Sequence, residues 1–223
     1  MSARSVTWPI NSGLSWPLDL GTTGKLADVR GLLPRTAGEE QAMRWTVHGR
    51  RALYESDWVN LWLEDVELPD GQRLQHHVLR MPRRSVTVVV LDEDGERVLL
   101  LWRHRFITDT WGWEVPAGWS EGDEAPEETA RREVEEETGW TPLSLTQLTT
   151  YYALPGLADL HFTMFRADGA RHLGAPSDGS EASRVEWVPV ANLRKLVDEG
   201  HITDGPSLMA LSFALAFRTP GDR

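Results

Sequence analysis

The sequence predicts an α/β sandwich, with a mixed β-sheet between helices, preceded by an antiparallel β subdomain. The apolar run SVTVVVL at Ser85–Leu91 indicates a strand buried on both faces. Pro126 opens a run of strong helix formers that ends at Gly139, where a left-handed cap is expected. Upstream, extended segments flank the turn signal Pro69–Gly71. Strands mixed with helices in this way are typical of a layered α/β domain.

The N-terminal part of the chain divides into two predicted regions. Residues 1–44 are expected to form an irregular arm, because Met1 to about Gln41 is rich in Gly, Pro, Ser and Thr. Residues 45–82 are expected to form the β subdomain, with extended segments at Arg51–Ser56, Trp58–Leu68 and Gln72–Leu79. Apolar residues fall on both faces of the middle segment, so we expect it to be buried on both sides, with a second subunit covering one of them.

The remaining elements belong to residues 83–223. Asp92–Gly95 predicts a turn, Arg97–Arg103 a strand, and Trp113–Val115 an extended lead into the helix that begins at Pro126. Beyond this helix, strands are expected near Leu143–Tyr152, Leu160–Arg166 and Val185–Val190, and helices near Val190–Asp198 and Gly205–Phe217.

The composition narrows the classes of function. The chain has no cysteine, which excludes disulfides and thiolate metal sites. There is no run of about 18 apolar residues to span a membrane and no apolar segment of a signal peptide, so we expect a cytoplasmic protein. The net charge of −11 argues against broad binding of nucleic acids or anionic membranes. An anionic substrate would therefore need local arginines or metal ions.

Three glutamates on the predicted helix offer two interpretations. Glu133, Glu136 and Glu137 stand at i, i+3 and i+4, which places their carboxylates on one helix face. Like charges so arranged repel, and a solvated acidic face is the simplest interpretation. A hard divalent cation would instead turn the repulsion into attraction, and Mg²⁺ commonly binds a few carboxylates and keeps waters for a phosphate-bearing substrate.

The residues around these glutamates resemble the Nudix box, G-x5-E-x7-R-E-U-x-E-E-x-G-U, in which U is an aliphatic or bulky apolar residue. Every fixed position is matched, by Gly118, Glu124, Arg132, Glu133, Glu136, Glu137 and Gly139. Val134 and Trp140 fill the U positions, and Trp140 is a mild departure because an aliphatic residue is more usual. The resemblance is strong over roughly residues 85–215 and implies a Nudix fold, with residues 83–223 as the hydrolase domain.

The resemblance also implies roles for the box residues. The three carboxylates are implied as ligands of Mg²⁺, with Mn²⁺ as an alternative, together with the backbone carbonyl of Ala117 or Gly118. Arg132 and Glu124 are implied to orient these ligands, and an ordinary ion pair that holds the loop would be compatible with that role.

Flanking segments resemble the ADP-ribose pyrophosphatase branch of the family. They are LLWRHRF at Leu100–Phe106 and WEVPAG at Trp113–Gly118. Arg105 matches a branch arginine implied to contact phosphate or ribose, and Glu114 matches a glutamate with a supporting role. Arg103 departs from the glutamine usual there and could add a second cation. Surface salt bridges are the alternative for both arginines.

Two downstream segments complete the predicted site. Pro155 stands sixteen residues after Gly139, as in the ADP-ribose branch, and Asp159 follows it; a simple turn between strands is the alternative. Glu181 is the candidate for the loop glutamate that acts as general base in this branch. Asp178 or Glu186 could take that place, Glu137 could serve instead, and a solvated loop acid is the alternative.

The resemblance implies Mg²⁺-dependent hydrolysis of a nucleoside diphosphate linked to another moiety, with ADP-ribose cleaved to AMP and ribose 5-phosphate as the first hypothesis. Other nucleotide sugars, nucleoside triphosphates and dinucleotides are the second. A non-catalytic, nucleotide-sensing module is the third, although such a module would be expected to lose box carboxylates. The expected partners are a small nucleotide and a second copy of the chain, since N-terminal strands commonly build a dimer in this branch.

Overall fold

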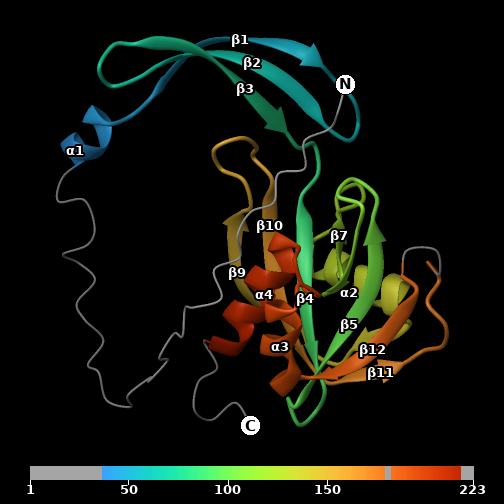
Figure 1. Ribbon diagram of the computed structural model, residues 1–223. Helices are drawn as coiled ribbons and strands as arrows, with labels where there is room; N and C mark the ends of the chain where they lie inside the picture. Colours follow the sequence, from blue (N-terminus) through green and yellow to red (C-terminus); the bar gives the residue numbers. More distant parts are fainter. Residues whose placement is uncertain (1–36, 179–181, 217–223) are drawn as a thin grey trace, which may run out of the picture. The chain divides into compact units, whose positions relative to one another are not determined.

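The computed structural model describes residues 37–178 and 182–216 (Figure 1). The chain divides into two compact units, residues 1–44 and residues 45–223. In the described part of the first unit, a short helix α1 spans Ala37–Ala42, inside the stretch that we expected to be irregular. Its sequence, AGEEQA, contains mostly good helix formers, which explains the difference.

The second unit begins with a three-stranded antiparallel sheet in which β2 lies between the other two strands. Its strands are β1 (Thr46–Tyr54), β2 (Asn60–Glu67) and β3 (Arg73–Arg80). Strands β2 and β3 pair along their whole length, which confirms the predicted hairpin. The turn between them contains Gly71 with φ of 85°, a left-handed conformation that favours glycine. Strand β1 begins five residues earlier than the predicted segment at Arg51.

Burial of this sheet on both faces is not seen within one chain. On β2 only Glu64 and Val66 are buried, among strand residues that are otherwise half-buried. Strand β1 is almost entirely exposed, and apolar side chains on or beside it, such as Val47 and Tyr54, are 54% and 58% exposed.

The central sheet of the second unit is mixed, with the strand order β12-β5-β4-β10-β9. These strands are β4 (Ser85–Leu91), β5 (Arg97–Arg105), β9 (Thr146–Tyr152), β10 (His161–Asp168) and β12 (Arg184–Pro189). Strand β10 runs parallel to β4, and the other pairs are antiparallel. The predicted mixed sheet is therefore confirmed.

Helices cover both faces of this sheet. Helix α2 (Pro126–Thr138) lies behind it in Figure 1, and helices α3 (Leu193–Asp198) and α4 (Gly205–Ala216) lie in front. Strand β4 serves both layers because successive side chains point to opposite faces. Val88 and its alternate neighbours pack in the core with α2, whereas Val89 packs in the core with α3 and α4. The predicted sandwich is confirmed, and no described helix is long and apolar enough to cross a membrane.

Several short strands were not predicted. They are β7 (Ala117–Trp119), β8 (Trp140–Pro142) and β11 (Ala170–His172), and β6 (Thr110–Glu114) was expected only at its end, in the extended lead Trp113–Val115. The helix predicted near Val190–Asp198 is formed by the 3₁₀ helix η2 (Val190–Asn192) together with α3. Strands β8 and β11 pair only with each other. Strand β7 pairs with the start of β4, and this pairing brings the loop before α2 against the buried sheet.

Candidate active site

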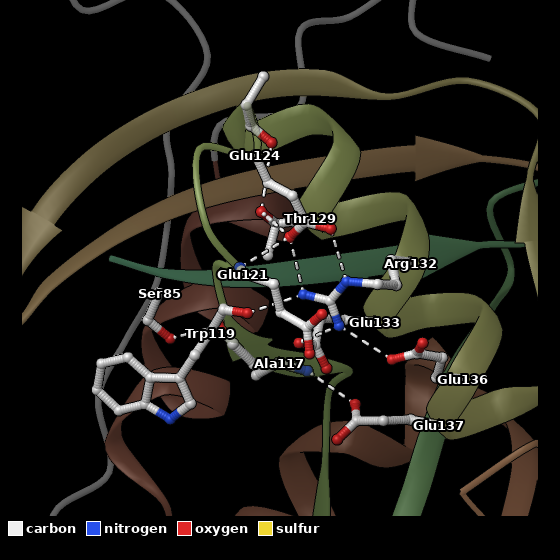
Figure 2. A network of polar contacts seen from close by, with 12 residues as sticks. Ser85, Ala117, Trp119, Glu121, Glu124, Thr129, Arg132, Glu133, Glu136 and Glu137 are labelled. Carbon is white, nitrogen blue, oxygen red and sulfur yellow. Dashed lines mark hydrogen bonds and ion pairs between the residues drawn. The ribbon is translucent and has the colours of Figure 1, made fainter. Parts of the chain in front are cut away.

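Helix α2 is placed by signals at both of its ends. Pro126 occupies its first turn, and Gly139 ends it with φ of 74° and ψ of 15°, its N–H donating to the Glu135 carbonyl. Both predicted helix signals are confirmed. Ala130 and Val134 are fully buried against the sheet and fix the helix in position. The three glutamates consequently face the loop formed by β7 (Figure 2).

The Arg132 guanidinium joins the carboxylates of the helix to the loop (Figure 2). Its Nε donates to Glu124 Oε1 at 2.9 Å, and its Nη2 donates to the Trp119 carbonyl at 2.8 Å. Its Nη1 donates to both Glu133 Oε1 and Glu136 Oε2 at 2.9 Å. The hydrogen bonds from Arg132 lower the pKa of Glu124 to about 2, and the carboxylates raise the pKa of Arg132. The positive charge of Arg132, which belongs to the same helix, thus offsets the repulsion expected among the glutamates.

Glu137 is the buried member of the acidic face, with 3% exposure. Its Oε1 accepts a hydrogen bond from Arg103 Nη1 at 2.7 Å, and its Oε2 accepts one from the backbone N–H of Ala117 at 3.0 Å. Burial raises the pKa of Glu137 to about 8, an effect that the Arg103 charge opposes. Both oxygens are therefore held in fixed directions.

The loop approaches helix α2 closely at Gly118, where the Glu133 carboxylate occupies the place of a side chain. A Cβ atom on Gly118 would lie 2.1 Å from Glu133 Cδ. The Gly118 carbonyl accepts a hydrogen bond from Ser85 Oγ at 2.8 Å, which ties the loop to β4. A side chain at this position would therefore displace the Glu133 carboxylate.

The other two predicted substrate residues of this region form an ion pair. Arg105 Nε donates to Glu114 Oε1 at 2.9 Å, and Glu114 is buried while Arg105 is about half exposed. Asp204 lies nearby at the start of α4, where its carboxylate accepts a hydrogen bond from the Ser207 N–H at 2.9 Å. Burial, followed by the charge of Glu114, raises the pKa of Asp204.

These residues surround a cavity of about 510 Å³. The cavity is lined by predicted residues, namely Arg103, Arg105, Ala117, Gly118, Arg132, Glu133, Glu136, Glu137 and Asp178. Glu114 and Glu124 do not line it but contact arginines that do. Residues that were not predicted from the sequence also line it, namely Trp58, Arg83, Ser85, Trp119, Glu121, Phe162, Asp204 and Pro206. In the sequence, Arg83 is marked only by its place next to Arg84, directly before the buried strand.

Pro155 and Asp159 line a different cavity, of about 670 Å³, which also contains Arg80 and Glu64 of the N-terminal sheet. Asp159 accepts hydrogen bonds from the Met81 N–H at 2.8 Å and from Arg80 Nη1 at 3.3 Å. The structure therefore does not place these two residues among the lining of the acidic cavity. They lie in the connection between β9 and β10, as the simpler interpretation expected.

The three candidate loop acids are Glu181, Asp178 and Glu186, and the structure describes the last two. Glu181 lies outside the described residues. Asp178 lines the acidic cavity, and its N–H donates to the Glu136 carbonyl at 3.1 Å. Glu186 lies on β12, where it pairs with Arg184 at 2.9 Å, and it is not among the lining residues.

Comparison with known proteins agrees with this geometry. Residues 81–211 match the family model of the NUDIX domain, and residues 45–79 match that of the nucleoside diphosphate sugar hydrolase N-terminal domain. A CMP-5'-(N-acetyl-N-hydroxy-3-aminopropyl)phosphonate hydrolase of Streptomyces rubellomurinus is 36% identical, over 76% of this chain and 82% of the relative. An ADP-ribose pyrophosphatase of Bacillus subtilis is 31% identical, over 74% of this chain and 89% of the relative.

A solved structure shows the same fold. The crystal structure of an ADP compounds hydrolase superposes with a TM-score of 0.69 and 18% identity, covering 78% of this chain and 94% of that chain. The matched domain contains the complete box on the loop and helix that line the acidic cavity. By its sequence, its fold and the full set of box residues, the chain belongs to the Nudix family of hydrolases.

Proposed function

We propose that the chain hydrolyses the phosphoanhydride bond of a nucleoside diphosphate joined to another group. ADP-ribose is the first candidate substrate, with AMP and ribose 5-phosphate as products. One observation carries the proposal: Glu133, Glu136 and Glu137 line one cavity together with several arginines, as cleavage of a diphosphate requires. The similarity to the Bacillus subtilis ADP-ribose pyrophosphatase supports ADP-ribose.

The donor atoms of the cavity fit Mg²⁺, with Mn²⁺ as the alternative. Carboxylate oxygens are the ligands that these ions prefer, and the missing Cβ of Gly118 leaves room for the Glu133 carboxylate beside the loop. Among residues 37–178 and 182–216, no three acidic or histidine side chains are arranged as a metal site. Arg132 and Arg103 occupy the carboxylates instead, so a cation would compete with them for the same oxygens.

We propose Glu133, Glu136 and Glu137 as the side chains that would hold the ion, with a backbone carbonyl at Ala117 or Gly118. When bound, the ion would neutralise phosphate charge and lower the pKa of a bound water. Arg132 and Glu124 would keep the helix carboxylates and the loop in register through the contacts described above.

Side chains of the protein would accept the proton of the attacking water and hold the substrate in place. Water adds to one phosphorus, the bridging P–O bond breaks, and a carboxylate accepts the proton of the water. We propose Glu181 for this role, with Glu137 as the alternative. Arg105 is proposed to contact the phosphate or the ribose, and its pairing with Glu114 would hold the guanidinium in place.

A second candidate substrate is a cytidine nucleotide linked to a phosphonate. The observation that favours it is the 36% identity to the Streptomyces rubellomurinus hydrolase, which exceeds the identity to the ADP-ribose pyrophosphatase of Bacillus subtilis. Both candidates join a nucleoside 5'-phosphate to a second phosphorus atom through one oxygen, so the same site chemistry serves either. A non-catalytic sensor is less well supported, because every box carboxylate is present. Other nucleotide sugars, nucleoside triphosphates and dinucleotides stay as further candidate substrates of the same site.

We further propose a homodimer built by residues 45–82, together with a cytoplasmic location. The dimer is supported by apolar side chains on and around β1, such as Trp45 and Val47, which are 50% and 54% exposed in the single chain. The absence of cysteine fits a reducing compartment. Light scattering after size exclusion, on the native chain and on Val47→Glu, would test the dimer.

The test of the proposed activity is the release of nucleoside monophosphate from a panel containing ADP-ribose, CMP linked to a phosphonate, other nucleotide sugars and ATP. Each substrate is assayed with Mg²⁺ and with EDTA, for the native chain and for Glu137→Gln. Mg²⁺-dependent AMP release from ADP-ribose that is lost in the variant would support the first candidate. Release of CMP alone would identify the phosphonate-linked nucleotide as the substrate and would still support the proposed hydrolysis. No turnover of any panel member would contradict hydrolysis.

A further inference from the structure

We propose that Arg83 binds a phosphoryl group of the substrate and that the Trp58 ring holds its guanidinium in place. Both side chains line the acidic cavity, although Trp58 lies in the connection between β1 and β2 and Arg83 lies between β3 and β4. The proposal rests on the hydrolase function proposed above and assigns part of its substrate recognition. It differs from the expectation drawn from the sequence, which placed that recognition on Arg105 and Arg103.

The pairing of the arginines in the cavity singles out Arg83. Arg103 is paired with Glu137, Arg105 with Glu114, and Arg132 with three carboxylates. In the described part of the chain, no carboxylate lies in ion-pair contact with Arg83. A guanidinium that is already bound to a carboxylate offers fewer free N–H groups to a substrate, so Arg83 is the cavity arginine best able to receive an anion.

The Trp58 ring gives this arginine a defined position. The Arg83 Cζ atom lies 4.7 Å from the centroid of the Trp58 ring, within the range of a cation–π contact. Stacking of this kind covers the face of the guanidinium and leaves the N–H groups on its edge available for a phosphate.

The loop that carries Trp58 is itself fixed. Ser56 Oγ donates to the Val59 carbonyl at 2.9 Å and accepts hydrogen bonds from the N–H groups of Trp58 and Val59. The Ser56 N–H donates to Asn60 Oδ1 at 2.9 Å. The ring therefore rests on a turn closed by four hydrogen bonds, although the ring itself is 64% exposed.

The negative charge of the cavity makes an unpaired arginine important for binding an anionic substrate. Its lining includes several carboxylates, namely Glu121, Glu133, Glu136, Glu137, Asp178 and Asp204. These groups repel a diphosphate, and the arginines that pair with them neutralise only part of that charge. A guanidinium outside these pairs adds attraction and a planar set of donors that matches phosphate oxygens.

The experiment compares Arg83→Gln with Arg84→Gln, which removes the same charge from an exposed neighbour that does not line this cavity. With the substrate turned over by the native chain, we expect Arg83→Gln to raise KM by about 10- to 100-fold with little change in kcat, because a charge-assisted hydrogen bond is lost. Arg84→Gln should stay within about twofold of native, Arg83→Lys should recover part of the loss, and Trp58→Leu should raise KM by about threefold. Thermal melting of each variant verifies that it folds.

Binding of ADP in EDTA, measured by calorimetry, separates this proposal from the hydrolase function. An unchanged KM in Arg83→Gln, or equal changes in Arg83→Gln and Arg84→Gln, would overturn the role of Arg83 while hydrolysis stands. If the native chain turns over no nucleotide but binds ADP in a way that depends on Arg83, phosphoryl binding by Arg83 would stand and hydrolysis would be overturned. A native chain that neither binds ADP nor turns over any nucleotide would overturn both.

Discussion

The Arg103 guanidinium donates to the Glu137 carboxylate across 2.7 Å, and this ion pair joins strand β5 to helix α2 inside the site. Their side chains are only 6% and 4% exposed. A buried charge without a partner is costly, so each residue requires the other in the absence of a further cation. The pair also places a positive charge where a metal ion would compete for the same oxygen.

Breaking this pair should destabilise the chain. We expect Arg103→Met to lower the free energy of unfolding by about 1–3 kcal/mol at pH 7 in EDTA, because the buried Glu137 carboxyl, whose pKa burial already raises, would lose the hydrogen bond from Arg103. The double variant Arg103→Met with Glu137→Gln should recover much of the loss, since neither buried charge remains. Urea denaturation measures both. Equal stability of the native chain and the single variant would show that the pair contributes nothing.

The ion pair between Glu124 and Arg132 should make stability depend on pH. Arg132 holds the pKa of Glu124 at about 2 in the folded chain, below the usual value of about 4.3 in an unfolded chain. A lowered folded pKa stabilises the protein above the unfolded pKa, and this contribution is lost as the pH falls toward 2. Glu124→Gln should therefore be less stable than native at pH 7 by about 1 kcal/mol, with a difference that shrinks below about pH 4.

Denaturant midpoints at several pH values would measure this difference. The matched control is Glu93→Gln, an exposed turn residue, which should track the native chain at every pH. A gap between native and Glu124→Gln that stays constant from pH 7 to pH 3 would argue against the ion pair as its source.

Gly118→Ala should impair the site more than the fold. The added Cβ would lie 2.1 Å from Glu133 Cδ, so the carboxylate or the loop must shift. We expect kcat/KM to fall by about 10- to 100-fold, as when the support of a ligand is lost, with little change in stability because only the flexible end of Glu133 has to move. Gly49→Ala is the control, because nothing lies within 4 Å of the added atom. Full activity in Gly118→Ala would show that activity does not depend on the observed position of the Glu133 carboxylate.

Metal binding should distinguish the site carboxylates from an ordinary acidic surface. We expect Glu136→Gln to weaken Mn²⁺ binding by at least about tenfold, as measured by electron paramagnetic resonance, because it would remove one of the proposed ligands. Glu135→Gln removes the same charge from the neighbouring helix position, which does not line the acidic cavity, and should change the affinity by less than about twofold. Equal weakening in both variants would support the solvated acidic face instead.

Local signals made the helix of the site predictable from sequence. Pro126 and Gly139 mark its ends, and the spacing of its glutamates fixes their common face, because a helix has a known period. The pairing of Glu124 with Arg132 was also expected, since both lie in the same loop and helix.

Contacts between distant segments were beyond such reasoning. Arg103 lies 34 residues before Glu137, and no local pattern indicates that its side chain would turn inward to that carboxylate. Arg83 reaches the cavity because β4 pairs with β7, and Trp58 reaches it from a loop in the N-terminal sheet. Strands β8 and β11 escaped prediction for the same reason, because each is three residues long and is defined only by its partner.

The proposed hydrolysis is tested most directly by a ³¹P NMR time course of the native chain with ADP-ribose, first in EDTA and then after addition of Mg²⁺. We expect an unchanged diphosphate signal in EDTA, followed by equal growth of AMP and ribose 5-phosphate signals once Mg²⁺ is present. Hydrolysis at the same rate in EDTA, or release of orthophosphate in place of the two monoesters, would contradict this expectation.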